Sequence, residues 1–187
     1  RKKPKNVECG FGDDDPQARM IAATVDGVRV VSVYVPNGQE IGCEKHAYKL
    51  DWLSNLSDYL ADRYSPSQPL IVCGDFNIAP TDLDVAHPRI WAGSVLCDPE
   101  GRSAIEEIRS WGLVDVFRNL HPDTAAYSWW DYRNLGFPKN NGLRLDYILA
   151  TARLAESCEE ATIDREARKG QKPSDHAPVV AVFRDKK

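Results

Sequence analysis

The segment Val28–Val35 (VRVVSVYV) is β-branched and almost continuously apolar. A strand of this composition is typical of a sheet buried on both faces, because a strand with one wet face alternates apolar and polar residues. Leu70–Cys73 is a shorter apolar run, and Leu145–Ala150 and Val179–Phe183 are the last two clear strands. The sequence therefore predicts strands that lie inside the molecule and need other layers to cover them.

Between the predicted strands, apolar residues recur at helical spacing. Cys43–Tyr64 is predicted as a helix that ends at Ser65-Pro66, and Ser103–Trp111 as a second helix that stops at Gly112. Strands that alternate with helices and loops predict an α/β sandwich with its sheets inside. The length of 187 residues fits one domain, residues 1–187. The apolar face of the first helix consists of Tyr48, Trp52, Leu56, Tyr59 and Leu60.

Composition says more about the cellular compartment of the protein than about its function. No run is long and apolar enough to span a membrane, and the basic start Arg1-Lys2-Lys3 does not lead into an apolar signal segment. The five cysteines contain no Cys-x-x-Cys pair, which argues against a zinc knuckle or a disulfide framework. We therefore expect a cytoplasmic protein that binds no membrane. The net charge of −4 leaves DNA binding open, because carboxylates that bind a metal also add negative charge.

Gly74-Asp75-Phe76-Asn77 follows directly on the apolar strand Leu70–Cys73. Such a strand delivers the next residues to the rim of the sheet, where open α/β sheets place their sites. Asp75 and Asn77 are two residues apart in an extended segment, so their side chains point the same way. A carboxylate beside a carboxamide can take a proton or a hard cation and hold a reacting oxygen. A simple turn is the alternative, because Gly, Asp and Asn are common turn formers.

A second polar cluster, Ser174-Asp175-His176, comes just before the strand Val179–Phe183. Its imidazole can bind or protonate a phosphate, although a capped loop with an exposed histidine has the same pattern. Asp146 is a lone carboxylate inside an apolar strand, where a charge is costly unless it is paired. Its partner could be Arg144 or Arg133, or else His176. We favour the histidine, because a buried carboxylate that accepts from an imidazole nitrogen fixes the tautomer and keeps the ring cationic.

The loop Tyr127–Arg133 (YSWWDYR) brings four aromatic residues and an arginine together. Apolar cores also use aromatic residues, but not usually clustered in a loop rich in Gly, Asn and Pro. Exposed aromatic rings beside cations suit stacking on bases or filling a gap in a duplex. Tyr34, near the end of Val28–Val35, could reach the same rim, either as a phosphate contact or as a residue at the edge of the core.

Taken together and in this order, these segments resemble the exonuclease III / class II abasic-site endonuclease family. They cover most of the chain. The GDxN and SDH motifs alone indicate only the wider endonuclease/exonuclease/phosphatase superfamily, whereas the Trp-Trp-Asp-Tyr-Arg loop and the Asn-Ile-Ala-Pro-Thr-Asp segment select the DNA-repair branch. The matching stretches are Phe11–Asp15, Val33–Gly38, Gly74–Asp84, Ser110–Arg118, Ser128–Arg133, Gly142–Asp146 and Ser174–Pro178.

The resemblance implies a four-layer αββα sandwich of the DNase I-like fold. It also implies a monomeric DNA-repair nuclease that uses Mg²⁺, with Mn²⁺ as an alternative, on duplex DNA with abasic sites or 3′ ends. A 3′-phosphatase activity at the same site is a further activity that the resemblance allows. The implied catalytic residues are Tyr34, Asp75, Asn77, Asp146 and His176, and the implied metal site consists of Asp75, Asn77, Asp175 and His176. The implied substrate contacts are Gln39, Lys45, Trp129, Trp130 and Arg133, with the two tryptophans lining the pocket for the baseless sugar.

The resemblance further implies an N-terminal strand and loop with an Asn, followed by a strand that ends in a Glu ligand of Mg²⁺. This sequence opens at Arg1, just before the segment that resembles the family's Phe-Gly-Asp-Asp region. We interpret the chain as the larger, C-terminal part of the domain and the fold as incomplete at its N-terminus. Loss of a hard carboxylate ligand weakens Mg²⁺ binding, so we expect little or no nuclease activity from these residues alone.

Two alternatives stay open. One is a nucleic-acid-binding regulator of the same fold without catalysis, against which the retained residues Asp75, Asn77, Asp146, Asp175 and His176 argue. The other is a phosphatase or phosphodiesterase that acts on a small molecule or lipid head group, against which the aromatic loop Tyr127–Arg133 argues.

Overall fold

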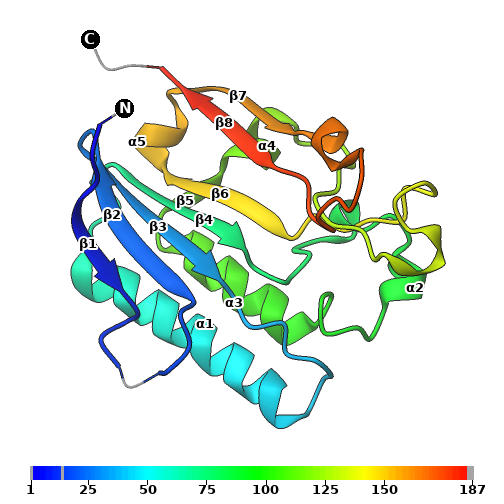
Figure 1. Ribbon diagram of the computed structural model, residues 1–187. Helices are drawn as coiled ribbons and strands as arrows, with labels where there is room; N and C mark the ends of the chain where they lie inside the picture. Colours follow the sequence, from blue (N-terminus) through cyan, green and yellow to red (C-terminus); the bar gives the residue numbers. More distant parts are fainter. Residues whose placement is uncertain (1, 14, 185–187) are drawn as a thin grey trace.

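The computed structural model describes residues 2–13 and 15–184. Its main feature is a six-stranded sheet in the order β1-β2-β3-β4-β6-β5 (Figure 1). β3 and β4 run parallel, and the other neighbouring strands are antiparallel. The strands are β1 (Lys5–Cys9), β2 (Met20–Val25), β3 (Val28–Tyr34), β4 (Leu70–Asp75), β5 (Leu113–Asp115) and β6 (Asp146–Thr151).

Helices cover one face of this sheet and a second sheet covers part of the other (Figure 1). The helical layer consists of α1 (Glu44–Arg63) and α3 (Pro99–Ser110), and the small sheet of β7 (Cys158–Ile163) and β8 (Val179–Phe183). The predicted α/β sandwich with its sheets inside is therefore confirmed. The remaining short elements are η1 (Asp82–Asp84), α2 (Pro88–Trp91), α4 (Val116–Leu120), η2 (Arg133–Leu135), α5 (Ala152–Ala155) and η3 (Arg165–Arg168).

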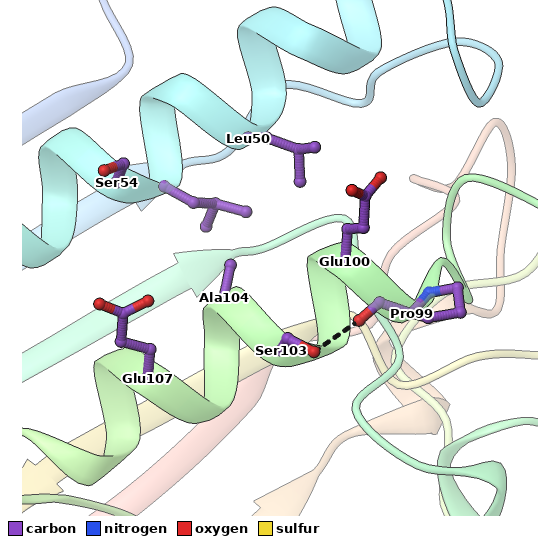
Figure 2. A pocket seen from close by; sticks show the side chains of 8 residues that line it. Leu50, Ser54, Pro99, Glu100, Ser103, Ala104 and Glu107 are labelled. Atoms are coloured by element: carbon purple, nitrogen blue, oxygen red, sulfur yellow. Dashed lines mark hydrogen bonds between the residues drawn. The ribbon is translucent and has the colours of Figure 1, made fainter.

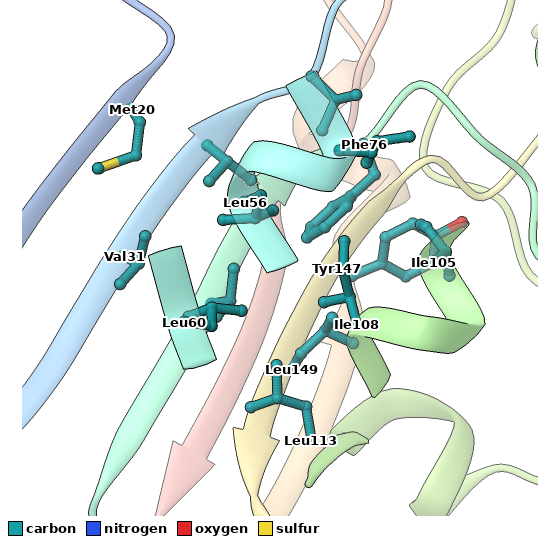
Figure 3. Close-up of a cluster of buried hydrophobic side chains, with 14 of the residues drawn as sticks. Met20, Val31, Leu56, Leu60, Phe76, Ile105, Ile108, Leu113, Tyr147 and Leu149 are labelled. Atoms are coloured by element: carbon teal, nitrogen blue, oxygen red, sulfur yellow. The ribbon is translucent and has the colours of Figure 1, made fainter. Parts of the chain in front are cut away.

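Two apolar cores join these layers. The larger one lies between the helices and the six-stranded sheet, and Figure 3 shows Leu56 and Leu60 of α1 meeting Val31 and Leu149 of the sheet there. The second lies around the small sheet, where Ala150 and Ala161 are buried together with α4 and α5. β4 and β6 are thus held from both sides, which makes them rigid supports for the residues at their ends. Within the described part of the chain, no helix has the length and apolar composition to cross a bilayer.

The predicted elements agree with the structure to within a few residues. The strand Val179–Phe183 has the predicted bounds, and the helix predicted over Cys43–Tyr64 spans Glu44–Arg63. The helix predicted from Ser103 begins earlier, at Pro99. Asp98 caps it by accepting from the backbone N–H of Gly101, and a proline suits the first helical position because its missing N–H would have had no partner.

Two predictions about strands were incomplete or wrong. The sequence did not indicate β1, β2, β5 or β7: β1 is exposed along its whole length and β7 carries two glutamates, so pairing with neighbours, not local apolar character, makes them strands. The prediction that Val28–Val35 is buried on both faces is wrong for its second half, because Ser32 and Tyr34 are exposed. The small sheet has only two strands, and among the residues of β3 only Val28 packs against its core.

Candidate active site

The site forms where β4 ends beside β3 and β6. Gly74 has φ +138°, and a Cβ atom there would lie 1.9 Å from the carbonyl oxygen of Val33, so only glycine permits this approach of the two strands. Asp75 follows and lies opposite Asp146 in the antiparallel register with β6, and beside Tyr34 in the parallel register with β3. Three strands therefore deliver three predicted site residues to one edge of the sheet.

Asp75 and Asn77 form a turn in place of the predicted extended segment, and this turn places Asp75 beside Asp146 and His176. The Asp75 carboxylate accepts from the backbone N–H of Asn77 at 2.8 Å and from its side-chain Nδ2 at 3.0 Å, and Asn77 has φ +52°. The second Nδ2 hydrogen goes to the carbonyl oxygen of Val35, and Oδ1 accepts from Asn37. Both amide hydrogens are thus used within the protein. Asn77 holds Asp75 in place, and it has no N–H donor left for a reacting oxygen.

His176 is the partner of Asp146, as predicted. Its Nδ1 donates to Oδ2 of Asp146 at 2.8 Å, while Nε2 lies 3.8 Å from Oδ2 of Asp75, too far for a hydrogen bond. The alternatives pair elsewhere: Arg144 binds Asp84 and Asp115, and Arg133 binds Asp131. The imidazole is therefore fixed at Nδ1, and when the ring is protonated its Nε2–H is free to donate on the other side.

The two carboxylates and the imidazole perturb one another. Burial raises the pKa of Asp75 to about 7, and the nearby carboxylate of Asp146 acts in the same direction. Burial by itself disfavours the charged form of His176, but the hydrogen bond and charge of Asp146 outweigh it, so the pKa of His176 is raised. The carboxyl groups of Asp75 and Asp146 thus share the imidazole of His176. One ligand atom from each of Asp75, Asp146 and His176 lies within 4.8 Å of the others, so the three groups are close enough together to hold a metal ion.

The aromatic loop Tyr127–Arg133 is hydrogen bonded to the Ser174-Asp175-His176 motif, and Asp175 accepts these hydrogen bonds. Oδ2 of Asp175 accepts from Nε1 of Trp129 at 3.0 Å, its backbone oxygen accepts from the backbone N–H of Trp130, and Trp129 bridges to His176. Asp175 is therefore outside the group of three possible metal ligands, contrary to its predicted place in the metal site. Trp129 remains half-buried beside the site.

The other predicted substrate contacts divide into accessible and buried groups. Trp130 is only 1% exposed and its indole N–H is bonded to Asn140, so it does not line an open pocket in this structure. Gln39 and Lys45 are exposed in and after the loop that follows β3, and the Arg133 side chain is 84% exposed. Tyr34 is 52% exposed, with the Arg19 guanidinium 4.9 Å from its ring centre.

Sequence reasoning missed the residues that hold the site together. Ser128 accepts from the backbone N–H groups of Leu145 and Asp146, and its carbonyl oxygen accepts from the N–H of Ala177. Lys49 is buried beneath the turn at Asn77. A signal existed for the lysine: it lies three residues before Trp52 and seven before Leu56, on the apolar stripe of the helix.

A groove of about 420 Å³ between α1 and α3 is a different feature of the surface (Figure 2). It lies on the helical layer and is lined in part by Leu50, Ser54, Glu100 and Glu107. None of the predicted site residues lines it. The predicted site residues that the structure brings together therefore lie at the sheet edge and not in this groove.

Comparisons with known proteins identify the family of the chain. The sequence model described as the Endonuclease/Exonuclease/phosphatase family matches residues 1–176. Exodeoxyribonuclease III of Haemophilus influenzae is 36% identical over 98% of this chain and 74% of its own length. The structure superposes with a TM-score of 0.94 on an AP endonuclease from Archaeoglobus fulgidus, at 38% identity over 97% of this chain and 72% of the other. It superposes equally well, at 0.94, on a 3′ phosphatase from Neisseria bound to a product DNA hairpin, at 39% identity over 98% and 72%.

Proposed function

The chain belongs to the Endonuclease/Exonuclease/phosphatase family and, within it, to the exonuclease III group, and from that premise we propose that it is a divalent-metal-dependent DNA-repair nuclease. Its reaction is the hydrolysis of phosphodiester bonds in duplex DNA at abasic sites and 3′ ends, and removal of a 3′-phosphate uses the same site. The juxtaposition of Asp75, Asp146 and His176 at one sheet edge is the observation that carries the proposal.

The relatives support DNA as the substrate. Their names give exodeoxyribonuclease and apurinic-site endonuclease activities, and the Neisseria protein was solved with a product DNA hairpin. In this chain, the accessible rings and cations beside the site are suited to a nucleic acid. Trp129 is half-buried next to His176, while Tyr132 and Arg133 are exposed in the same loop. A stacking ring with adjacent cations is a typical contact for an unpaired nucleotide.

The residues present fit a hard divalent cation. The donors are two carboxylates and an imidazole. Burial, followed by the charge of Asp146, raises the pKa of Asp75, and a bound cation would offset both effects. Oxygen-rich sites of this kind suit Mg²⁺, with Mn²⁺ as a substitute. Asp75 and Asp146 would hold the ion beside His176. When bound, it would neutralise charge on the phosphate and act as a Lewis acid.

The side chains themselves divide the remaining work. Asp75, whose carboxylate lies beside Asp146 and His176, is suited to orient an attacking water and accept its proton. Asn77 keeps that carboxylate in one orientation. His176 presents its free Nε2 to a phosphate oxygen, because Asp146 holds Nδ1. In-line attack of the water on phosphorus breaks the bond between phosphorus and the 3′ oxygen of the phosphodiester, and the 3′ oxygen leaves and takes up a proton. By analogy with its relatives, we propose that a 3′-hydroxyl and a 5′-phosphate result.

The test is cleavage of a 5′-labelled duplex that contains one abasic-site analogue, with Mg²⁺ or with EDTA, by the protein at its full natural length. We expect one cut at the analogue in Mg²⁺ only, and the same duplex with an ordinary base should be cut far more slowly. Asp75→Asn and His176→Ala should each lower the rate by about 100-fold or more, because each removes a group that takes part in proton transfer or charge stabilisation.

Asp51→Asn and His87→Ala are the matched controls, since both side chains are exposed and lie outside the site. The controls should retain the wild-type rate. Duplex binding without cleavage in any divalent metal would instead favour a regulatory protein of the same fold. Faster hydrolysis of inositol phosphates than of DNA would favour a small-molecule phosphatase. Full activity of Asp75→Asn and His176→Ala would refute the site assignment.

A further inference from the structure

Lys49 is a long cationic side chain with no exposure to solvent. It lies on α1 facing the protein interior, and its side chain is 0% exposed. Gly38 passes directly over its stem: a Cβ atom at Gly38 would lie 2.9 Å from Cδ of Lys49 and 2.8 Å from Cγ2 of Val95. Gly38 has φ +88°, so both its conformation and the available space favour glycine. The loop after β3 is thus closed over the lysine.

The ammonium group donates to three backbone carbonyl groups. Nζ lies 2.8 Å from the carbonyl oxygen of Asn77, 3.0 Å from that of Val95 and 3.2 Å from that of Asn37. An ammonium group has three N–H donors, so every donor has an acceptor. The three acceptors belong to three different connections: the loop after β3, the turn after β4 and the segment before α3. One side chain therefore ties together three loops that are distant in sequence.

Burial of the Lys49 ammonium group is energetically unfavourable. No carboxylate in the described part of the chain forms an ion pair with Lys49, and burial lowers its pKa to about 8, although Asp98 and Asp75 act in the opposite direction. A buried ammonium group costs free energy that an apolar side chain of similar length would avoid. What the lysine supplies, and an apolar side chain cannot, is three directed donors. The position of the loops is therefore the property that Lys49 controls.

Two of the three loops belong to the active site. The side chains of Asn37 and Asn77 are hydrogen bonded to each other at 3.0 Å, and Asn77 in turn holds both carboxylate oxygens of Asp75. Asn77 adopts a positive φ, an uncommon backbone conformation for a residue other than glycine, and its carbonyl oxygen is the closest acceptor of Lys49. A continuous series of contacts therefore leads from the ammonium group to the Asp75 carboxylate.

We propose that Lys49 is a positioning residue for catalysis, which holds the turn at Asn77 and thereby the orientation of the Asp75 carboxylate toward the reacting water. It touches neither DNA nor the reacting atoms, because it is buried beneath the turn. Its loss should therefore affect the chemical step more than the binding of the duplex. The inference rests on the proposed nuclease function and assigns a supporting residue to the same site.

The test compares Lys49→Met and Lys49→Gln with Leu60→Ala in the protein at its full natural length. Leu60 is a buried residue of α1 eleven positions farther along the helix, so its loss destabilises the fold without touching the loops. At a temperature where all variants are folded by circular dichroism, kcat on an abasic-site duplex should fall by about 10- to 100-fold in Lys49→Met, because a small misplacement of a catalytic group can cost this much. KM should change by less than about threefold, since no DNA contact is lost.

Lys49→Gln keeps two N–H donors without the charge, so its kcat should lie between those of Lys49→Met and the wild type. In ¹H–¹⁵N NMR spectra, the side-chain amide signals of Asn37 and Asn77 should shift in both Lys49 variants but not in Leu60→Ala. If Lys49→Met does not fold, kcat and the amide signals are measured on Lys49→Gln alone. Equal kcat in the Lys49 variants and in Leu60→Ala, or unshifted amide signals, would overturn the proposal. A wild-type protein that leaves abasic DNA uncut would instead refute the proposed function, and the NMR comparison would still test the positioning of Asn77.

Discussion

One cluster of buried acids and one cluster of partly buried acids differ in how far positive charges balance the carboxylates. In the first, Arg144 donates to Asp84 at 2.6 Å and to Asp115 at 2.7 Å, and Arg118 adds a second guanidinium at 2.7 Å from Asp84. We call it the arginine cluster. In the second, Asp75 and Asp146 share the single imidazole of His176.

The pKa values of the carboxyl groups in the two clusters differ because the clusters differ in the amount of positive charge beside them. In the arginine cluster, burial would raise the pKa of Asp84, but the charge and hydrogen bonds of Arg144 outweigh it and lower the pKa. At the active site, burial and the neighbouring Asp146 raise the pKa of Asp75 to about 7. A cluster with matched charges stabilises the fold, whereas a cluster with excess negative charge is ready to bind a proton or a cation. The comparison separates residues for stability from residues for chemistry.

Arg144→Met should have the largest effect on stability. It leaves Asp84 without one of its two cations and leaves Asp115 without a cation, and both carboxylates are buried. Breaking a buried ion pair on one side costs about 3–5 kcal/mol, which urea denaturation can measure. Arg109→Met removes a surface pair with Glu106 and should cost less than about 1 kcal/mol. Similar losses in both variants would show that the arginine cluster is not the stabilising one.

Asp146→Asn should affect activity and leave stability nearly unchanged. The amide preserves the shape of the carboxylate but no longer stabilises the cationic imidazole of His176. Loss of such a supporting carboxylate typically lowers activity by about 10- to 100-fold. Asp115→Asn should show the reverse, with reduced stability and an unchanged rate per folded molecule. Cleavage rates on an abasic-site duplex and urea unfolding midpoints should be measured for both variants. A clear loss of stability in Asp146→Asn, or a loss of rate in Asp115→Asn, would contradict the comparison.

Acid should weaken the arginine cluster in a defined direction. Because the pKa of Asp84 is lower in the folded protein than its ordinary value of 3.8, the unfolded chain takes up the proton first as pH falls. The stabilisation is therefore present above about pH 4 and is lost as pH falls through the lower, folded pKa. Hydrogen bonds to a charged group suggest a contribution of about 2 kcal/mol.

Urea unfolding at pH 3 and pH 6 measures this dependence. The difference in stability between the two pH values should be smaller in Asp84→Asn than in the wild type. Asp51→Asn, in which the replaced carboxylate is exposed, should behave like the wild type. An unchanged pH dependence in Asp84→Asn would mean that the carboxylate is not held by the arginines in solution.

Divalent metal should stabilise the active-site cluster and not the arginine cluster. At a Mg²⁺ or Mn²⁺ concentration ten times the dissociation constant, binding to the folded state adds about 1.4 kcal/mol. The unfolding midpoint of the wild type should rise with metal, and that of Asp84→Asn should rise equally. Asp75→Asn should lose the shift. This measurement needs no nuclease activity, so a persistent shift in Asp75→Asn would relocate the metal site independently of catalysis.

Much of the fold and part of the site could be predicted from local patterns. The apolar run of β8 and the helical spacing of α1 predict the bounds of these elements to within a residue. Hydrophobic periodicity and the residues that end an element are local features of the sequence. The pairing of Asp146 with His176 was also predicted, because a lone carboxylate in an apolar strand needs a partner. The short or polar strands β1, β5 and β7 escaped prediction, because a strand of this kind is stabilised by its neighbours.

By itself, the sequence determined which chemical groups the protein has, the family to which it belongs and the strand ends that carry its motifs. Only the tertiary structure decided how those groups divide their work. It buried Trp130, turned Asp175 toward Trp129 and placed Lys49 beneath Asn77. The physical reason is that these contacts join residues 28 to 46 positions apart, or depend on the packing around them. Sheet register and loop closure set such contacts, and neither is encoded in a local pattern.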